Sequence, residues 1–293
     1  MGYDYVKEIW DVTPVQEVGK GVFLKRDDLF RPFDDIPLNG GKVRQCMSLL
    51  IDNWGTIKEK CNSKVVTASN ISSPQGIIVA RCCREFGIES ETFIGGSSQE
   101  SAKKHTLIQN IIRQGGKVNT ECRIGYTQVV QNLINKKKES GEKFFDVGFG
   151  FNVLSQKESL VDSISNQVKN LPSDLDYLFV PCGSAITFSA ILKGLVKYKI
   201  RPKKVVGIQI AGYDRTNTVD SIVNNSIEYE FLKSKDYPYS KHLKLSFAGV
   251  RLDRVYESKA MDYIAKYLSD DIKGKRWCFW IVGDSSDVRD NVY

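Results

Sequence analysis

The stretches VFLKRDDLF (residues 22–30) and NGGKVRQCMSLL (residues 39–50) decide the fold class at the start of the chain. The first is rich in β-forming residues and predicts a strand, and the second opens an apolar-periodic helix with a Gly-Gly-Lys. Lys42 therefore stands at a helix start, where the helix dipole disfavours the charged amine and favours a nucleophilic one. For such a segment alone, the alternative is a lysine that is simply solvated.

The alternation of strands and helices continues along the chain. Strands are predicted at residues 22–25, 64–68, 91–94, 143–147, 177–180, 204–210 and 277–282. Helices are predicted at residues 42–54, 74–86, 100–114, 127–138, 158–171, 185–198 and 256–268. This order requires crossover connections, so we predict an α/β fold with parallel-rich sheets covered on both faces by helices. Residues 214–245 are weakly periodic, and we expect a surface excursion with one short helix there.

The composition is that of a folded globular protein with one or two domains, because 41% of the 293 residues are hydrophobic and 26% are charged. No apolar run reaches the about 18 residues that cross a bilayer, and no secretory signal opens the chain, so we expect a cytoplasmic protein without membrane contact. The seven cysteines are scattered and never spaced C-x-x-C, which favours reduced, mostly buried thiols and no metal site. The net charge of +7 suits either an anionic partner or a lysine-rich solvated surface.

Three further segments carry polar groups at strand-to-helix junctions. In VVTASNISSPQG (residues 65–76) a polar loop enters a helix at Pro74, which offers a carboxylate free backbone N–H groups and neutral donors. In LFVPCGSAIT (residues 178–187) a strand runs into small residues and then a helix, an arrangement suited to a phosphate monoester. In RLDRVYESKAM (residues 251–261) a Tyr-Glu pair opens a helix. Taken singly, each is also compatible with an ordinary helix cap, turn or helix start.

Together these segments resemble the pyridoxal-phosphate (PLP) enzymes related to 1-aminocyclopropane-1-carboxylate (ACC) deaminase and D-cysteine desulfhydrase. The patterns K-R-[ED]-D-L and G-G-N-K-x-R of that family stand here as Lys25–Leu29 and Gly40–Arg44. The four blocks occur in the family's order, and the resemblance spans about residues 22–284. It implies a two-lobed fold type II (tryptophan-synthase-β-like) enzyme, with PLP in the cleft between a large lobe (residues 1–45 and 148–293) and a small lobe (residues 46–147).

The resemblance also implies roles for residues. Lys42 carries PLP as a Schiff base and shuttles protons, and Tyr256 and Ser73 act near the substrate. Glu257 faces the pyridine nitrogen, where a carboxylate makes the ring a stronger electron sink. The cofactor is also contacted by Asn70, Ser72, Gly183, Ser184, Ala185, Ile186 and Thr187. The substrate carboxylate is held by Ser69, Asn70, Ser72, Ser73 and Gln75.

The chain departs from the family pattern at several positions. Gly41 precedes the lysine where the family commonly has Asn, and Ile186 replaces a glycine of the phosphate loop. A β-branched residue does not easily adopt φ > 0, so the loop either uses right-handed backbone angles there or binds phosphate less tightly. The usual C-terminal H-T-G-G reads Ile281–Asp284 and lacks its hydroxyl. Tyr237 and Tyr239 are the candidates for the family's second active-site tyrosine.

Three functions are compatible with these observations. The first is a PLP-dependent lyase or deaminase of amino-acid metabolism that acts at Cα of a small amino acid. The second is a PLP-dependent enzyme, such as a decarboxylase, acting on an amino-acid group attached to a larger anionic substrate such as modified nucleic acid. The third is a non-catalytic PLP-binding relative, which the presence of both Lys42 and Glu257 disfavours. The resemblance further implies a homodimer.

Overall fold

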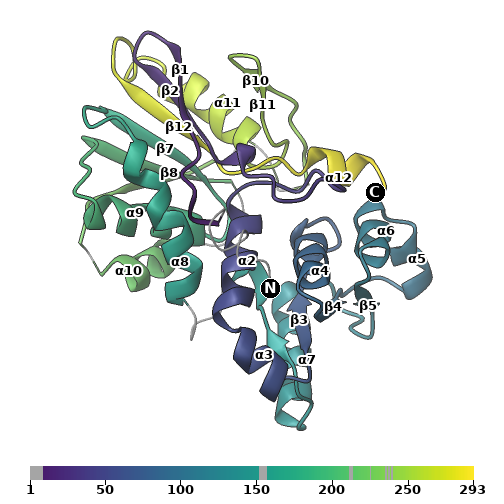
Figure 1. The fold of residues 1–293 in the computed structure, drawn as a ribbon. Helices are drawn as coiled ribbons and strands as arrows, with labels where there is room; N and C mark the ends of the chain where they lie inside the picture. Colours follow the sequence, from purple (N-terminus) through teal and green to yellow (C-terminus); the bar gives the residue numbers. More distant parts are fainter. Residues whose placement is uncertain are drawn as a thin grey trace.

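The computed structural model describes residues 9–151, 157–210, 214–224, 226–234, 236, 238 and 240–293. Figure 1 shows an α/β molecule in two parts, each built on its own sheet, with α2 (Gly41–Asp52) running between them. None of the helices in these described ranges is long and apolar enough to span a bilayer.

The larger sheet has six strands in the order β1-β2-β12-β7-β8-β9. Their bounds are β1 Val15–Gly19, β2 Val22–Arg26, β7 Tyr177–Cys182, β8 Lys204–Gln209, β9 Glu230–Lys233 and β12 Trp277–Ile281. Only the β1–β2 pair is antiparallel, and β1 lies at the edge. Every residue of the inner strand β12 is buried, as expected for a parallel strand covered on both faces.

Helices cover both faces of this sheet. On one face, Phe279 and Ile281 belong to a core cluster with residues of α11 (Glu257–Tyr267). On the other face, Cys278 and Trp280 pack in a cluster with residues of α8 (Lys157–Ser165) and α9 (Ile186–Lys197). The alternation of side chains along β12 thus assigns its residues to two separate apolar layers.

The smaller sheet has four parallel strands in the order β5-β4-β3-β6. Their bounds are β3 Lys64–Ala68, β4 Glu89–Phe93, β5 Lys117–Asn119 and β6 Phe145–Asp146. The accompanying helices are α3 Trp54–Lys60, α4 Gln75–Glu85, α5 Gln99–Lys103, α6 Thr106–Arg113 and α7 Thr127–Glu139. The two sheets lie on the two sides of the predicted lobe division, and the boundaries at residues 45/46 and 147/148 stay a prediction.

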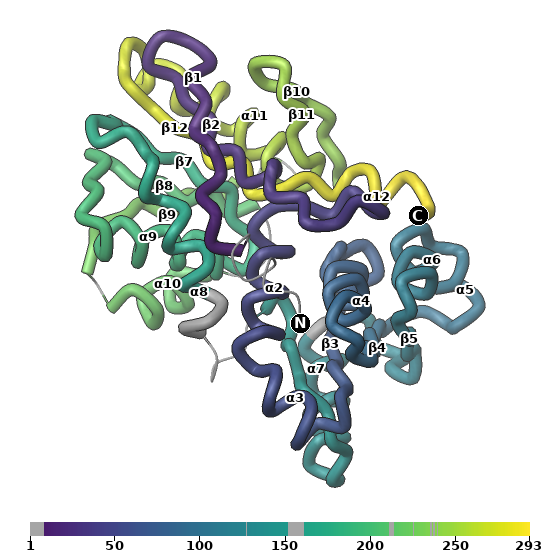
Figure 2. The backbone as a smooth tube through the Cα atoms, viewed as in Figure 1, coloured from purple at the N-terminus to yellow at the C-terminus, as the bar shows by residue number. Residues whose placement is uncertain are grey.

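The C-terminal segment connects the two parts of the molecule. After β12 the chain crosses toward the smaller sheet and forms α12 (Ser286–Asp290) beside α6, as the tube in Figure 2 shows. The buried Asn110 of α6 donates hydrogen bonds to the carbonyl oxygens of Val288 (2.9 Å) and Asn291 (2.8 Å). Its side-chain oxygen accepts a bond of 2.6 Å from the backbone N–H of Tyr293. Residues 283–293, here called the C-terminal strap, are therefore fastened to α6.

Most predicted elements are confirmed within a few residues, with some differences. The predicted helix at residues 100–114 is two helices that part at His105, and the predicted strand at 143–147 is reduced to Phe145–Asp146. The excursion at 214–245 contains the expected short helix, α10 (Thr216–Val223), but also β9, which joins the larger sheet. A small hairpin of β10 (Ser246–Phe247) and β11 (Val250–Arg251) was not expected. All seven cysteines are free thiols and six are buried, as predicted.

Candidate active site

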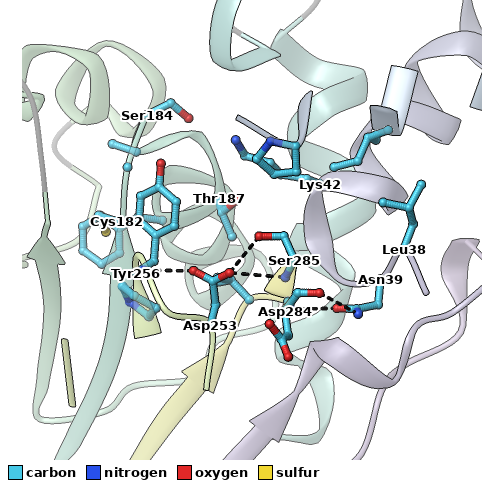
Figure 3. A pocket seen from close by; sticks show the side chains of 18 residues that line it. Leu38, Asn39, Lys42, Cys182, Ser184, Thr187, Asp253, Tyr256, Asp284 and Ser285 are labelled. Atoms are coloured by element: carbon cyan, nitrogen blue, oxygen red, sulfur yellow. Dashed lines mark hydrogen bonds between the residues drawn. The ribbon is translucent and has the colours of Figure 1, made fainter. Parts of the chain in front are cut away.

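A pocket is formed where the starts of α2, α4 and α9 meet the residues before α11 and after β12. Figure 3 shows Lys42 on one side of it and Tyr256 and Asp253 on the other. The described lining residues are Leu38, Asn39, Lys42, Pro74, Ile78, Pro181–Ala185, Thr187, Phe188, Asp253, Tyr256 and Val282–Ser285. The pocket thus draws on both parts of the molecule, with Pro74 and Ile78 coming from the side of the smaller sheet, as a ligand site between two lobes does.

Lys42 is the second residue of α2 and lines this pocket. Burial lowers the pKa of its amine from 10.5 to about 8, the charge of Arg289 lowers it too, and the carboxylate of Asp253 opposes the shift. Among the described residues, no hydrogen bond or ion pair occupies this amine. The lysine is therefore available for reaction inside the pocket, and its lowered pKa gives it a larger neutral fraction near neutral pH than an exposed lysine has.

The predicted phosphate loop also reaches the pocket, through Gly183, Ser184, Ala185 and Thr187. Ala185 precedes α9 and has left-handed backbone angles (φ 66°, ψ 0°), whereas Ile186 begins the helix and is buried. The left-handed backbone conformation is therefore adopted by Ala185, and the β-branched Ile186 does not need a positive φ. The first backbone N–H groups of any helix have no intrahelical acceptor, and among the described residues no side chain caps those of α9.

The neighbouring residues Tyr256 and Glu257 take different positions relative to the pocket. The ring of Tyr256 lines the pocket and lies against Gly183, where a Cβ would come within 2.7 Å of its Cε1 atom. Glu257 is fully buried and is not one of the described lining residues. Its carboxyl oxygens accept bonds of 2.9 Å from the backbone N–H groups of Asp253 and Gly283. Burial, and then the charge of Asp253, raise the pKa of Glu257 well above its usual value.

Asp253 is a pocket residue that the sequence analysis did not single out. One of its oxygens accepts bonds from the backbone N–H groups of Val255 (2.9 Å) and Tyr256 (3.0 Å). The other accepts a bond of 2.8 Å from the hydroxyl of Ser285, as drawn in Figure 3. Asp253 therefore joins the start of α11 to the C-terminal strap. The signal available in the sequence was its position three residues before Tyr256 in the same motif.

The polar loop before α4 lies beside the pocket, but of its residues 69–75 only Pro74 is among the described lining residues. Gln75 is buried and donates to the hydroxyl of Thr67 (2.7 Å) and the carbonyl of Gly148 (2.6 Å), while its oxygen accepts from the N–H of Gly150 (2.7 Å). Ser73 accepts from the backbone of Gln75, and Asn70 accepts from that of Ser72. Ser69 donates to the carbonyl of Asn70. The substrate and cofactor contacts assigned to this loop stay predictions.

The segment after β12 supplies groups that the sequence pattern did not reveal. Asn39 pairs with the backbone of Asp284, donating to its carbonyl (2.9 Å) and accepting from its N–H (2.8 Å). Ser285 brings a hydroxyl to the pocket two residues beyond the glycine-containing turn at Gly283, although the family's hydroxyl is lacking at its usual place. Tyr237 and Tyr239, the candidates for a second tyrosine, lie outside the described residues.

No family model matches the chain. A curated relative, the O-seryl-dTMP PLP-dependent decarboxylase of Salmonella phage ViI, is 23% identical over 70% of this chain and 50% of its own length. The chain thus spans about half the length of that relative.

Solved structures share the fold over nearly the whole chain. An ACC deaminase homologue superposes with a TM-score of 0.72 at 18% identity, covering 93% of this chain and 89% of its own. The O-acetyl serine sulfhydrylase isoform 3 of Entamoeba histolytica gives 0.67 at 12% identity and covers 100% and 93%. The threonine deaminase isoform 2 of Solanum lycopersicum gives 0.61 at 14% identity and covers 97% and 90%. The chain therefore has the two-lobed α/β architecture of fold type II that its sequence predicts.

Proposed function

We propose that this chain is a PLP-dependent enzyme that acts at the Cα atom of an amino-acid group through Lys42. The observation that carries the proposal is the position of Lys42, which lines one pocket together with the uncapped start of α9. An amine of lowered pKa can react with an aldehyde, and a free helix N-terminus can bind a phosphate monoester. PLP carries both groups.

The residues around the pocket fit the remaining parts of PLP. The hydroxyls of Ser184 and Thr187 flank the start of α9, where they would add donors to the phosphate. Glu257 is not among the described lining residues, and its carboxyl oxygens bond to the backbone N–H groups of Asp253 and Gly283, so its contact with the pyridine nitrogen stays a prediction of the resemblance. Tyr256 would lie against the ring. When bound, PLP supplies an electron sink for the negative charge that develops at Cα.

The chain's own residues would control the proton and the water around Cα. Lys42, with a pKa of about 8, can both accept and return a proton near neutral pH. Leu38, Pro74 and Ile78 are apolar lining residues that would limit the access of water to the reacting atoms. Asp253 holds the start of α11 and the C-terminal strap in place on the opposite side.

Decarboxylation of an amino-acid group attached to a nucleotide is the reaction that we favour. It is supported by the relative from Salmonella phage ViI, whose name gives O-seryl-dTMP as substrate and decarboxylation as reaction. In that reaction the bond between Cα and the carboxylate breaks, CO₂ leaves, and a proton is added to Cα. Lys42 is the residue that would deliver this proton. The net charge of +7 suits an anionic substrate.

A lyase or deaminase acting on a small free amino acid is the second candidate. It is favoured by the Tyr256-Glu257 pair in the deaminase-like motif and by the fold similarity to the ACC deaminase homologue. A homodimer is a further proposal from the same resemblance, and sedimentation of the PLP-loaded protein would test it.

The two candidate reactions release different products, so one experiment separates them. The PLP-loaded protein is incubated with O-seryl-dTMP, L-serine and ACC, and CO₂ and ammonia are measured separately. We expect CO₂ from O-seryl-dTMP without ammonia, and neither product with Lys42→Ala. Ammonia from a free amino acid, with no CO₂ from the nucleotide, would contradict decarboxylation and support the second candidate.

A further inference from the structure

Arg289 lies beside the pocket at a place where two distant segments meet. Its Nε atom donates a hydrogen bond of 3.0 Å to the hydroxyl of Ser285, which lines the pocket. Its Nη1 atom donates to the carbonyl oxygen of Ser72, in the loop before α4. Its Nη2 atom is buried and, among the described residues, has no acceptor. The guanidinium thus has a buried N–H donor that no described residue occupies.

The position of Arg289 is fixed by the C-terminal strap. The neighbouring Val288 is buried, and its carbonyl accepts a bond from Asn110 of α6. The two arginines that contact the strap from the β11–α11 segment are already paired: Arg251 with Asp284 and Asp287, and Arg254 with Asp290. Arg289, in contrast, has no carboxylate partner in the part of the chain that the structure describes.

The loop expected to hold the substrate carboxylate has several donors in use. The N–H groups of Ser72, Ser73 and Gln75 bond within the loop, to Asn70 Oδ1, the Asn70 carbonyl and Ser73 Oγ. The amide of Gln75 donates to Thr67 and Gly148 instead. Arg289, which bonds to the carbonyl of Ser72 in this loop, is a charged donor beside it with an N–H group that no described residue occupies.

We propose that Arg289 binds an oxyanion of the substrate, either the carboxylate of the amino-acid group or the phosphate of the nucleotide. The inference rests on the proposed function, because it assigns this role in the same pocket. An oxyanion that displaces the Ser72 carbonyl can accept from Nη1 and Nη2 in parallel, and such charge-assisted pairs are stronger than a bond to a neutral carbonyl. The charge of Arg289 also lowers the pKa of Lys42, which supports their proximity.

The test measures the binding of the two halves of the proposed substrate class to PLP-loaded protein by calorimetry. L-serine carries the carboxylate without a phosphate, and dTMP carries the phosphate without a carboxylate. The variants are Arg289→Gln and Arg289→Lys, and the matched control is Arg254→Gln, which removes an already paired positive charge nearby. The covalent PLP–lysine linkage is measured in every variant by borohydride reduction and mass spectrometry.

We expect Arg289→Gln to weaken the binding of one probe by about 10- to 100-fold and to change the binding of the other by less than about 2-fold. The PLP–lysine linkage should stay intact. Loss of dTMP binding assigns the phosphate, and loss of L-serine binding assigns the carboxylate. Arg289→Lys should recover part of the binding, whereas Arg254→Gln should change neither probe.

Three results would overturn the inference. In Arg289→Gln, the binding of both probes could be unchanged, or the binding of both could be weakened equally. The wild-type protein could also form the PLP–lysine linkage and bind neither probe. A wild-type protein that forms no PLP–lysine linkage would instead contradict the proposed function itself.

Discussion

Lys42 reaches the pocket because Gly40 precedes α2 in a conformation that other residues rarely adopt. Gly40 has a φ of 85°, and a Cβ atom there would lie 2.2 Å from the carbonyl oxygen of Val282. The chain therefore approaches the end of β12 closely at this point, and the N–H of Gly41 donates to the same carbonyl (2.9 Å). The Gly-Gly-Lys pattern thus supplies both the glycine that the backbone needs at residue 40 and the amine of Lys42.

We expect Gly40→Ala to destabilise the fold by at least about 1–3 kcal/mol, because strain and the clash with Val282 act together. Denaturant unfolding measures this change. Gly55→Ala is the control, since Gly55 lies in α3 with no atom within 4 Å of an added Cβ. It should stabilise the protein by up to about 1 kcal/mol. Equal changes in the free energy of unfolding for the two substitutions would show that the close approach to Val282 does not exclude a side chain at residue 40.

The pKa of Lys42 predicts how PLP uptake depends on pH. Because burial lowers this pKa from 10.5 to about 8, the neutral amine accumulates through pH 8 and is the major form above it. The rate of PLP capture by the apoprotein should therefore rise up to about pH 8 and then level off, as followed by absorbance. A rate that still rises steeply toward pH 10.5 would contradict the lowered pKa. Arg289→Gln should move the inflection upward, because it removes a positive charge.

The sequence could reveal the residues that belong to short motifs but not those that act across the fold. Lys42, Tyr256 and Thr187 stand in contiguous patterns, and all three line the pocket. The contacts of Asp253 and Arg289 become known only from the structure, although Asp253 stands in the same motif as Tyr256. Asp253 bonds to Ser285, 32 residues away, and Arg289 bonds to Ser72, 217 residues away. The spacing of residues along the chain does not predict hydrogen bonds between residues so far apart in sequence.

The start of α9 is the element that binds an anion in this account. Ala185 takes the left-handed angles before the helix, and Thr187 is held by a 3.4 Å hydrogen bond from Gln45 of α2. The phosphate loop is therefore connected directly to the helix that carries Lys42. If Lys42 and the start of α9 bind PLP as proposed, this contact links the two elements that would hold its aldehyde and its phosphate.

The double substitution Ser184→Ala with Thr187→Val should weaken PLP binding by about 1–3 kcal/mol, because it removes hydroxyl donors to a charged group while keeping the shape. Equilibrium titration with PLP measures the change. Ser189→Ala is the control, because that hydroxyl donates to the carbonyl of Ala185 and lies one turn into the helix. If the double variant binds PLP as wild type does, the phosphate lies elsewhere.

Elements were predictable where burial made their pattern strong. The inner strands β7, β8 and β12 are almost wholly buried, and their apolar runs predicted them within about two residues. Strand β1 is largely exposed, and β5 and β9 contain no fully buried residue, so each lacks an apolar run. Their strand conformation depends on pairing with a neighbour, which a local pattern does not encode.

At the scale of the whole molecule, the C-terminal strap ties the two parts together across the pocket. It leaves β12 of the larger sheet, supplies Asp284 and Ser285 to the pocket, and ends against α6 (Figure 2). The alternation of strands and helices along the chain predicted an α/β fold, and the family resemblance implied a ligand between two lobes. The sequence did not predict the strap, because α12 has five residues and no apolar periodicity of its own.

Asn110→Ala should release the strap from α6. The substitution removes three hydrogen bonds at a buried side chain, so we expect a loss of about 1–3 kcal/mol in the free energy of unfolding. Hydrogen exchange should increase first in residues 286–293, because they lose their attachment. An unchanged exchange rate there would contradict the role of Asn110. Asn132→Ala on the exposed face of α7 is the control and should change neither quantity.

The most direct test of the central claim is to load the protein with PLP, reduce it with borohydride and identify the labelled peptide. Two other lysines compete on chemical grounds, because burial also lowers the pKa of Lys25 and of Lys259 to about 8. Lys25, however, donates to Thr13 and Asn170, and Lys259 donates to Pro238. We predict a single label on Lys42 that is lost in Lys42→Ala. A label on Lys25 or Lys259, or a protein that takes up no PLP, would contradict the account.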